Sequence, residues 1–287
     1  MEWVAAKPAA ASRNAKIPPV LFVHGTFHGA WCWEAHWMNR FAAAGVECHA
    51  ISLRGTSGTP APDGQKSVQI TEHVADLRAF IDKVLVDESG NARPPPLLVG
   101  HSFGGSSVLK YLEAEHAASG AVFLCSVPPS GNTAMVARFL RRSLRQAWLI
   151  TKGFAMKAAA TDATVCRDLF FDEQTSLEDV ASYLPLLTAD AQVGLDVGHF
   201  TRNLPSKEAD FDGVAFWLEG SDTRMLVIGA ERDGVVDREG VEETATFVGE
   251  KGQAEYFDLP HDVMLCKGWE APCDRVIQFA KAFYQRD

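Results

Sequence analysis

The residues best suited to chemistry lie in one glycine-rich segment, Gly100-His101-Ser102-Phe103-Gly104. This G-x-S-x-G pattern follows an apolar run and precedes a helical pattern at 107–115, which predicts a strand-to-helix turn with the serine at its tip. Glycine at 100, 104 and 105 keeps such a strained corner free of collisions. The Ser102 hydroxyl is then placed for nucleophilic attack, and the Phe103 N–H at the helix start can donate to an oxyanion. A structural turn serine is the alternative interpretation.

A nucleophilic serine needs a general base, and the base needs a carboxylate that orients it. His261 follows an apolar run at 254–260, and Asp233 lies in the loop after another run at 224–230. The order serine, acid, histidine is the one expected for this strand pattern. Asp233 precedes a glycine that frees the turn, whereas its main rival, Asp237, is expected to cap a helix that begins near residue 238. We therefore predict a triad of Ser102, His261 and Asp233.

A second backbone donor is predicted where the first strong apolar run ends, at His24-Gly25-Thr26-Phe27. In a parallel sheet this loop and the Ser102 turn meet at one edge. Gly25 allows close approach of the backbone, so the Thr26 N–H is the predicted donor and the Phe27 N–H the alternative. His24 is expected to be tied to the backbone rather than to act as a base.

The other histidines and Asp262 are given no chemical role. Residues adjacent in sequence rarely have the geometry to orient each other's side chains, so Asp262 is expected to belong to the loop structure beside His261. The remaining histidines lack a paired acid or the spacing of metal ligands, and we expect each to be a surface or core residue: His28, His36, His49, His73, His101, His116 and His199.

Short apolar runs that alternate with helical patterns predict a mostly parallel sheet flanked by helices. One crossover helix is expected within 70–85, where apolar residues recur at helical spacing. Six runs are expected to be strands: 19–25, 46–53, 96–102, 120–127, 224–230 and 254–260.

The interval between the fourth and fifth strands is far longer than one crossover helix needs, which predicts an inserted helical cap at about 128–222. The core then comprises 17–127 and 223–287, and 1–16 is expected to be a disordered arm; together they form a single domain. An amphipathic helix is predicted at 135–150. Phe27, Phe139 and Trp148 are candidate pocket residues, although cap aromatics more often only pack cap against core.

The formal net charge of −10 disfavours nucleic acid as a partner, because the field would repel phosphates. Four arginines at 138, 141, 142 and 145 form a local basic face, for which a solvated helix surface is favoured over an anionic substrate or a membrane surface. No run of about 18 apolar residues predicts a membrane span or stable membrane insertion. Six scattered cysteines suit a reduced compartment. A cytoplasmic location is expected, with an organelle such as the chloroplast as the alternative.

The motifs together resemble the α/β-hydrolase superfamily over nearly the whole chain. His24-Gly25-Thr26-Phe27-His28-Gly29-Ala30-Trp31-Cys32-Trp33 is similar to the opening of the plant methylesterase and hydroxynitrile lyase group, in which HG-x-x-HGAW-x-W follows the first long strand. The resemblance implies the same triad and the same two oxyanion donors. The lyases of that group have Thr after the first His and Lys after the catalytic His. Gly25 and Asp262 depart from that pattern, so lyase activity is disfavoured.

These observations predict an enzyme that hydrolyses a small-molecule carboxylic ester, with lipophilic esters as one candidate class, through an acyl-enzyme and with no metal or organic cofactor. Two alternatives stay open. The same triad can cleave an amide or C–C bond, and a hydrolase-derived binding protein or receptor can retain a triad with little turnover. The oligomeric state and the acyl and alcohol specificity do not follow from the sequence.

Overall fold

The chain folds around one seven-stranded sheet, and the computed structural model describes residues 1–9, 14, 16–85, 93–114, 117–205, 223–249 and 254–283. The strand order is β1-β3-β2-β5-β6-β8-β9; β1 is antiparallel to β3 and every other pair is parallel. The strands are β1 Trp3–Ala6, β2 Val20–Val23, β3 Cys48–Ile51, β5 Leu97–His101, β6 Gly120–Leu124, β8 Arg224–Ala230 and β9 Ala254–Phe257. All six predicted strands are therefore confirmed.

The expectation of a disordered N-terminal arm is wrong for residues 3–6. These residues form β1 at the sheet edge, where Trp3 pairs with Ile51 and Ala6 with Cys48. The run Trp-Val-Ala-Ala is apolar but only four residues long, its side chains are half-buried or exposed, and its partner strand is distant in sequence, so the sequence alone did not indicate a strand. Residues 10–13 and 15 of the predicted arm lie outside the described residues.

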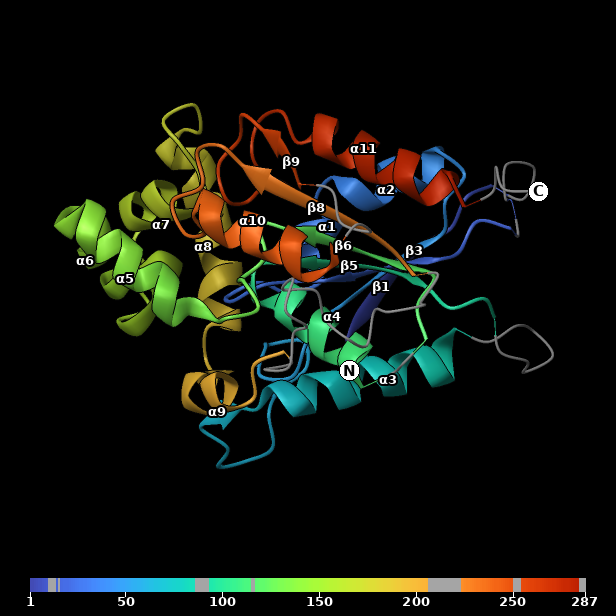
Figure 1. The fold of residues 1–287 in the computed structure, drawn as a ribbon, viewed down its shortest axis with the longest axis horizontal. Helices are drawn as coiled ribbons and strands as arrows, with labels where there is room; N and C mark the ends of the chain where they lie inside the picture. The colour runs from blue at the N-terminus through green and yellow to red at the C-terminus, as the bar shows by residue number, and fades with distance from the viewer. Residues whose placement is uncertain are drawn as a thin grey trace.

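Helices cover both faces of the sheet (Figure 1). The helices α2, Trp37–Ala43, and α11, Glu270–Lys281, lie on one face, and α3, Ile70–Val84, and α4, Phe103–Glu113, lie on the other. A short helix α1, Trp31–Glu34, follows the first loop, and α10, Arg238–Phe247, packs on β8 and β9. This is the layered arrangement that the alternating pattern predicts.

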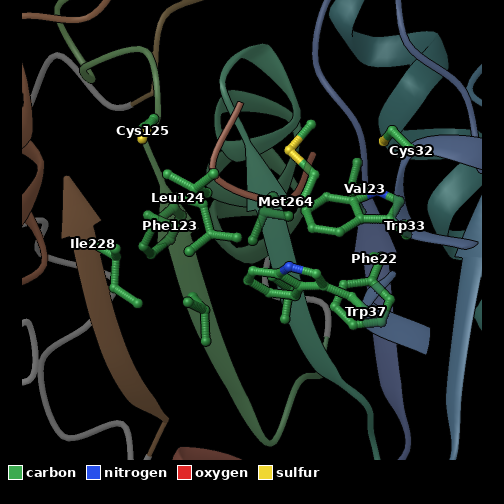
Figure 2. Close-up of a cluster of buried hydrophobic side chains, with 14 of the residues drawn as sticks. Phe22, Val23, Cys32, Trp33, Trp37, Phe123, Leu124, Cys125, Ile228 and Met264 are labelled. Atoms are coloured by element: carbon green, nitrogen blue, oxygen red, sulfur yellow. The ribbon is translucent and has the colours of Figure 1, made fainter. Parts of the chain in front are cut away.

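The core fills the space between the sheet and its helices, as Figure 2 shows for one cluster. Phe22 on β2 stacks on Trp33 with ring centroids 4.7 Å apart, and Trp37 of α2 meets the same Phe22 edge-on at 6.0 Å. All three rings are fully buried. Aromatic burial of this size is a large favourable term in folding, and it anchors the strand whose end carries the Gly25 loop.

The insertion forms a helical cap at one end of the sheet (Figure 1, left). Its described elements are α5 Asn132–Arg142, α6 Leu144–Ala155, a 3₁₀ turn η2 Ala158–Ala160, α7 Ala163–Phe170, α8 Leu177–Asp190, β7 Gly194–Leu195 and α9 Val197–Arg202. Strand β7 pairs in parallel with β4, Ser67–Val68, of the core. The part of the predicted cap at 206–222 lies outside the described residues.

The single cap helix predicted at 135–150 is wrong, because Ser143 divides it into α5 and α6. Ser143 has extended backbone angles, φ −156° and ψ 108°, and its hydroxyl accepts the Gln146 N–H as the N-cap of α6. The helical spacing of apolar residues continues across Ser143, so periodicity alone does not reveal the break.

Candidate active site

Ser102 occupies a strained turn between β5 and α4. Its φ of 54° and ψ of −124° are unusual for a residue with a side chain, and α4 begins at the next residue, Phe103. The turn is possible because α4 lies directly on β2. A Cβ at position 104 would lie 2.5 Å from the His24 carbonyl oxygen, a distance that real side chains do not reach. Ser102 is therefore the N-cap residue of α4, and the Phe103 N–H belongs to the first turn of this helix.

The His24–His28 loop lies against Ser102 at the carboxyl end of β2. A Cβ at Gly25 would come 2.7 Å from the Ser102 Cβ, so only glycine permits this approach. Strand β2 has β3 on one side and β5 on the other, and their connections run in opposite directions. The carboxyl ends of strands at such a point form the usual ligand crevice of an open α/β sheet.

His24 is tied to the backbone at both ring nitrogens. The Leu53 N–H donates to His24 Nε2 at 2.8 Å, so the proton lies on Nδ1, which donates to the Gly25 carbonyl at 2.8 Å. Burial lowers the pKa of His24 to about 4, which keeps the ring neutral. Because a peptide group is planar and trans, holding the Gly25 carbonyl also orients the Thr26 N–H on the opposite side.

Asp233 and His261 form a buried hydrogen-bonded pair in adjacent loops after β8 and β9. His261 Nδ1 lies 2.8 Å from Asp233 Oδ2 and 2.9 Å from Oδ1. Asp233 Oδ1 also accepts the N–H groups of Val235 and Val236 at 2.7 and 2.8 Å. The His261 ring lies next to His101, the residue before Ser102, with ring centroids 4.7 Å apart. The carboxylate is thus held by its own loop and faces the imidazole.

The rival acid, Asp237, is engaged elsewhere. It accepts the Gly240 N–H as the N-cap of α10, as expected, and it receives a two-pronged hydrogen bond from Arg138 of α5 at 2.6 and 2.7 Å. Arg142 of α5 pairs with Glu239 of α10. Two of the four cap arginines therefore join cap to core, so the expectation of a wholly solvated basic face is wrong for Arg138 and Arg142.

A small hollow, open to solvent, lies beside the Ser102 turn. The core lines it with Gly25, Thr26, Phe27 and Phe103, and the cap lines the other side. The cap residues in this lining are Asp190, Val193, Gly194 and Leu195. Asp190 also holds the two parts together, since it accepts hydrogen bonds from the Trp31 indole at 2.8 Å and the Ser57 hydroxyl at 2.6 Å.

The three candidate pocket residues lie in three different settings. Phe27 lines the hollow, while Phe139 lines a separate hollow behind Asp233. Trp148 is 62% exposed on α6 and lines neither. Phe154 of α6 brings a cap aromatic to the oxyanion loop, because it stacks on Phe27 with ring centroids 5.7 Å apart, although it does not itself line the hollow. Phe170 of α7 continues this wall and stacks on His261 at 5.9 Å.

One feature of the site was not expected: His28 pairs with Asp262. His28 Nε2 lies 3.0 Å from Asp262 Oδ2, and both side chains are almost fully buried. The expectation that His28 has no paired acid is therefore wrong, as is the assignment of Asp262 to loop structure alone. The two residues are 234 positions apart, so no local spacing signals the pair. An acidic residue directly after the predicted base, in an otherwise apolar loop, was the available signal.

The remaining polar groups near the site are buried, and burial determines whether they are charged. The six cysteines are free and buried, as expected of small apolar residues, and Cys125 lies beside Asp233. Burial lowers the pKa of His101 to about 3, so that ring is neutral. Within the described residues, no helix combines the length and the apolar character that crossing a membrane requires.

Comparison with known proteins agrees with this architecture. The model of the alpha/beta hydrolase family matches residues 20–282, and the chain belongs to this family. It is 31% identical over 128 residues to the rice protein named probable esterase PIR7A, found in Oryza sativa subsp. indica and subsp. japonica. That match covers 42% of the chain and only 45% of the rice protein.

Solved structures of low sequence identity share the fold. The esterase EaEST from Exiguobacterium antarcticum superposes with a TM-score of 0.67 at 15% identity, covering 97% of this chain and 94% of that one. The esterase RhEst1 from Rhodococcus sp. ECU1013 gives a TM-score of 0.61 at 19% identity and covers 99% and 100% of the two chains. At these identities the likeness concerns the fold alone.

Proposed function

We propose that this protein is a serine hydrolase that cleaves small carboxylic esters through an acyl-enzyme. The observation that carries the proposal is the pairing of His261 with Asp233 at the same sheet edge as the strained Ser102 turn. Strained backbone persists only where its surroundings hold it, and such positions concentrate at active sites. The rice relative and the structural neighbours are named esterases, which favours an ester over an amide or C–C bond.

In the proposed mechanism His261 Nε2 takes the Ser102 proton while Oγ attacks the ester carbonyl carbon. The negative charge that develops on the carbonyl oxygen is held by the Thr26 and Phe103 N–H groups. The imidazolium then protonates the leaving alkoxide, and the alcohol departs. Water attacks the acyl-enzyme by the same path, with His261 as base, and releases the acid. Asp233 fixes the tautomer of His261 and stabilises its protonated form, and no step requires a metal or an organic cofactor.

The substrate is proposed to enter through the hollow between core and cap. Ser102 is only 4% exposed, and its neighbours Gly25 and Phe103 line that hollow. Phe27, Phe103 and Leu195 give it an apolar wall, which favours an acyl or alkyl group of modest length over a charged one. Butyrate esters are therefore expected to be better substrates than acetate esters.

Hydrolysis of p-nitrophenyl acetate and butyrate by wild type and Ser102→Ala tests the proposal. Loss of a triad serine is expected to lower turnover by up to about a millionfold. Ser130→Ala is the matched control, because this serine bonds Glu243 on the surface and is expected to leave turnover unchanged. Activity that survives Ser102→Ala would disprove the nucleophile. A single slow turnover by wild type would favour a binding protein instead.

A further inference from the structure

A second histidine–carboxylate pair, His28 and Asp262, lies beneath the proposed triad and takes no part in its chemistry. His28 is 1% exposed and Asp262 is fully buried. His28 Nε2 faces Asp262 Oδ2 at 3.0 Å, while His28 Nδ1 faces the Thr26 carbonyl oxygen at 2.8 Å. The ring is also packed between Trp31 and Phe170, with centroids 5.4 and 5.5 Å away.

Both ring nitrogens of His28 face oxygen atoms, and an imidazolium beside an ionised Asp262 satisfies both contacts with N–H donors. A carbonyl oxygen and an ionised carboxylate can only accept, which distinguishes this ring from the neutral His24, whose Nε2 accepts the Leu53 N–H. Burial alone would lower the pKa of His28, but the Asp262 charge and the two hydrogen bonds raise it. Burial likewise opposes ionisation of Asp262, yet His28 lowers its pKa. Both pKa shifts favour the imidazolium–carboxylate form of the pair.

On the His28 side, the pair holds the loop that carries the proposed oxyanion donor. Phe27 has a φ of 67°, in the left-handed region that disfavours a bulky residue. Such a conformation persists only where neighbouring contacts impose it. The hydrogen bond from His28 to Thr26 fixes the peptide between Thr26 and Phe27, and the bond from His24 to Gly25 fixes the preceding one. Thr26 thus lies between two peptides that are each pinned by a histidine.

On the Asp262 side, the pair holds the loop that carries the proposed base. Asp262 directly follows His261, and its N–H donates to the Phe170 carbonyl at 2.9 Å. His101 Nε2 lies 3.1 Å from the His261 carbonyl and 3.9 Å from Asp262 Oδ1. Since His101 precedes Ser102, the same cluster reaches three of the four loops of the proposed site, those after β2, β5 and β9.

The geometry points to His28 and Asp262 as positioning residues that lock the oxyanion loop to the base loop, an inference that rests on the proposed function. The pair touches no reacting atom in this scheme. It sets the distance between the donor and the base, and a misplacement of about 1 Å at such a site typically costs about a hundredfold in rate. The two residues are 234 positions apart in sequence, and their hydrogen bond joins the loop after β2 to the loop after β9.

Two substitutions at Asp262 separate positioning from charge. In Asp262→Asn, a neutral His28 can keep its Nδ1–H on Thr26 while its Nε2 accepts the amide N–H, so the link survives without ions. Asp262→Ala removes the link. We expect Asp262→Ala to lower kcat for p-nitrophenyl butyrate about a hundredfold with KM changed less than about threefold. Asp262→Asn is expected to recover most of that loss when kcat is taken on the plateau of its own pH profile.

Binding of butylboronic acid supplies a second readout, because its tetrahedral serine adduct presents an oxygen to the oxyanion donors. Its affinity is expected to fall in parallel with kcat in Asp262→Ala, a response that loss of stability alone does not produce. His28→Gln provides a variant that keeps a donor toward Asp262 and loses the bond to Thr26. It is expected to show the same parallel fall, and it tests the inference even where Asp262→Ala does not fold.

His49→Ala is the matched control, since His49 is a buried partner of Glu47 at 3.1 Å but lies within β3, outside the loops of the proposed site. It is expected to lower Tm and leave kcat unchanged. The inference is overturned if Asp262→Ala and His28→Gln keep kcat and boronate affinity within threefold, or if Asp262→Asn loses as much as Asp262→Ala. Failure of the proposed function looks different, because Ser102→Ala would then retain the activity.

Discussion

The core edge and the cap contribute to the candidate site in different ways. At the core edge, short loops after β2, β5, β8 and β9 place each functional group through backbone geometry and through hydrogen bonds within and between these loops. The cap instead supplies side-chain surfaces, such as Phe154 against Phe27, and is joined to the core through a few polar contacts such as Arg138 with Asp237. The difference suggests that the core sets the chemistry and the cap sets the substrate range.

The largest effect expected from this comparison separates the two aspartates after β8. Asp233→Asn removes the carboxylate that orients His261, and kcat is expected to fall about ten-thousandfold with little change in KM. Asp237→Asn removes the negative charge that pairs α10 with the cap arginine Arg138 and leaves a single acceptor oxygen. It is expected to lower the free energy of unfolding by about 2 kcal/mol while leaving kcat near that of wild type.

Steady-state kinetics and urea unfolding of both variants check this. Should Asp237→Asn lose activity as severely as Asp233→Asn while remaining folded, the assignment of the acid would be wrong. The division between a catalytic core edge and a structural cap contact would then fail as well.

The next effect concerns the close approach of the oxyanion loop to Ser102. Gly25→Ala adds a Cβ that would lie 2.7 Å from the Ser102 Cβ, so the loop must move and its donor is lost. We expect kcat to fall about a hundred- to thousandfold. In the cap, Gly198→Ala meets nothing closer than 3.4 Å and is expected to be silent. Equal activity of the two variants would show that the loop tolerates displacement.

A smaller effect tests the cap as the determinant of substrate range. Phe154→Ala removes the ring that stacks on Phe27 and is expected to raise KM for p-nitrophenyl butyrate about tenfold while changing KM for the acetate little. Trp148→Ala on the same helix serves as the control, because its side chain is 62% exposed. An equal change for both esters would place Phe154 outside the acyl pocket.

The contrast between core and cap also explains what the sequence predicts and what it does not. Ser102, Asp233 and His261 each follow a strand in a short loop, so the order of the strands and the glycines around them is enough to indicate their place. The six core strands are predicted for the same reason, because each is a continuous apolar run between turn residues. What is local in sequence is therefore predictable.

Features that depend on tertiary pairing were missed. The strand at Trp3–Ala6 forms because β3 offers it an edge to pair with, and His28 has a paired acid because Asp262, 234 positions away in sequence, faces it. The contact of Arg138 with Asp237 likewise depends on how the cap folds back on α10, whereas the break at Ser143 is a local N-cap that the spacing of apolar residues does not reveal. Neither spacing nor composition indicates such contacts. For this reason the choice of cap residues from the sequence missed the hollow beside Ser102: neither Phe139 nor Trp148 lines it.

The smallest effect expected is the contribution of His101, at the core edge, to the pH dependence of stability. Burial lowers the pKa of His101 to about 3, so below pH 6.5 the unfolded chain binds a proton that the folded chain does not. The free energy of unfolding therefore falls as the pH falls, by about 1 kcal/mol per such histidine between pH 6.5 and 5.5.

His101→Gln keeps a donor toward the His261 carbonyl but cannot titrate. Urea unfolding at the two pH values is expected to show a loss about 1 kcal/mol smaller in this variant than in wild type. Parallel losses would mean that the ring already takes up its proton in the folded state, and the neutral His101 assigned to the core edge would be wrong.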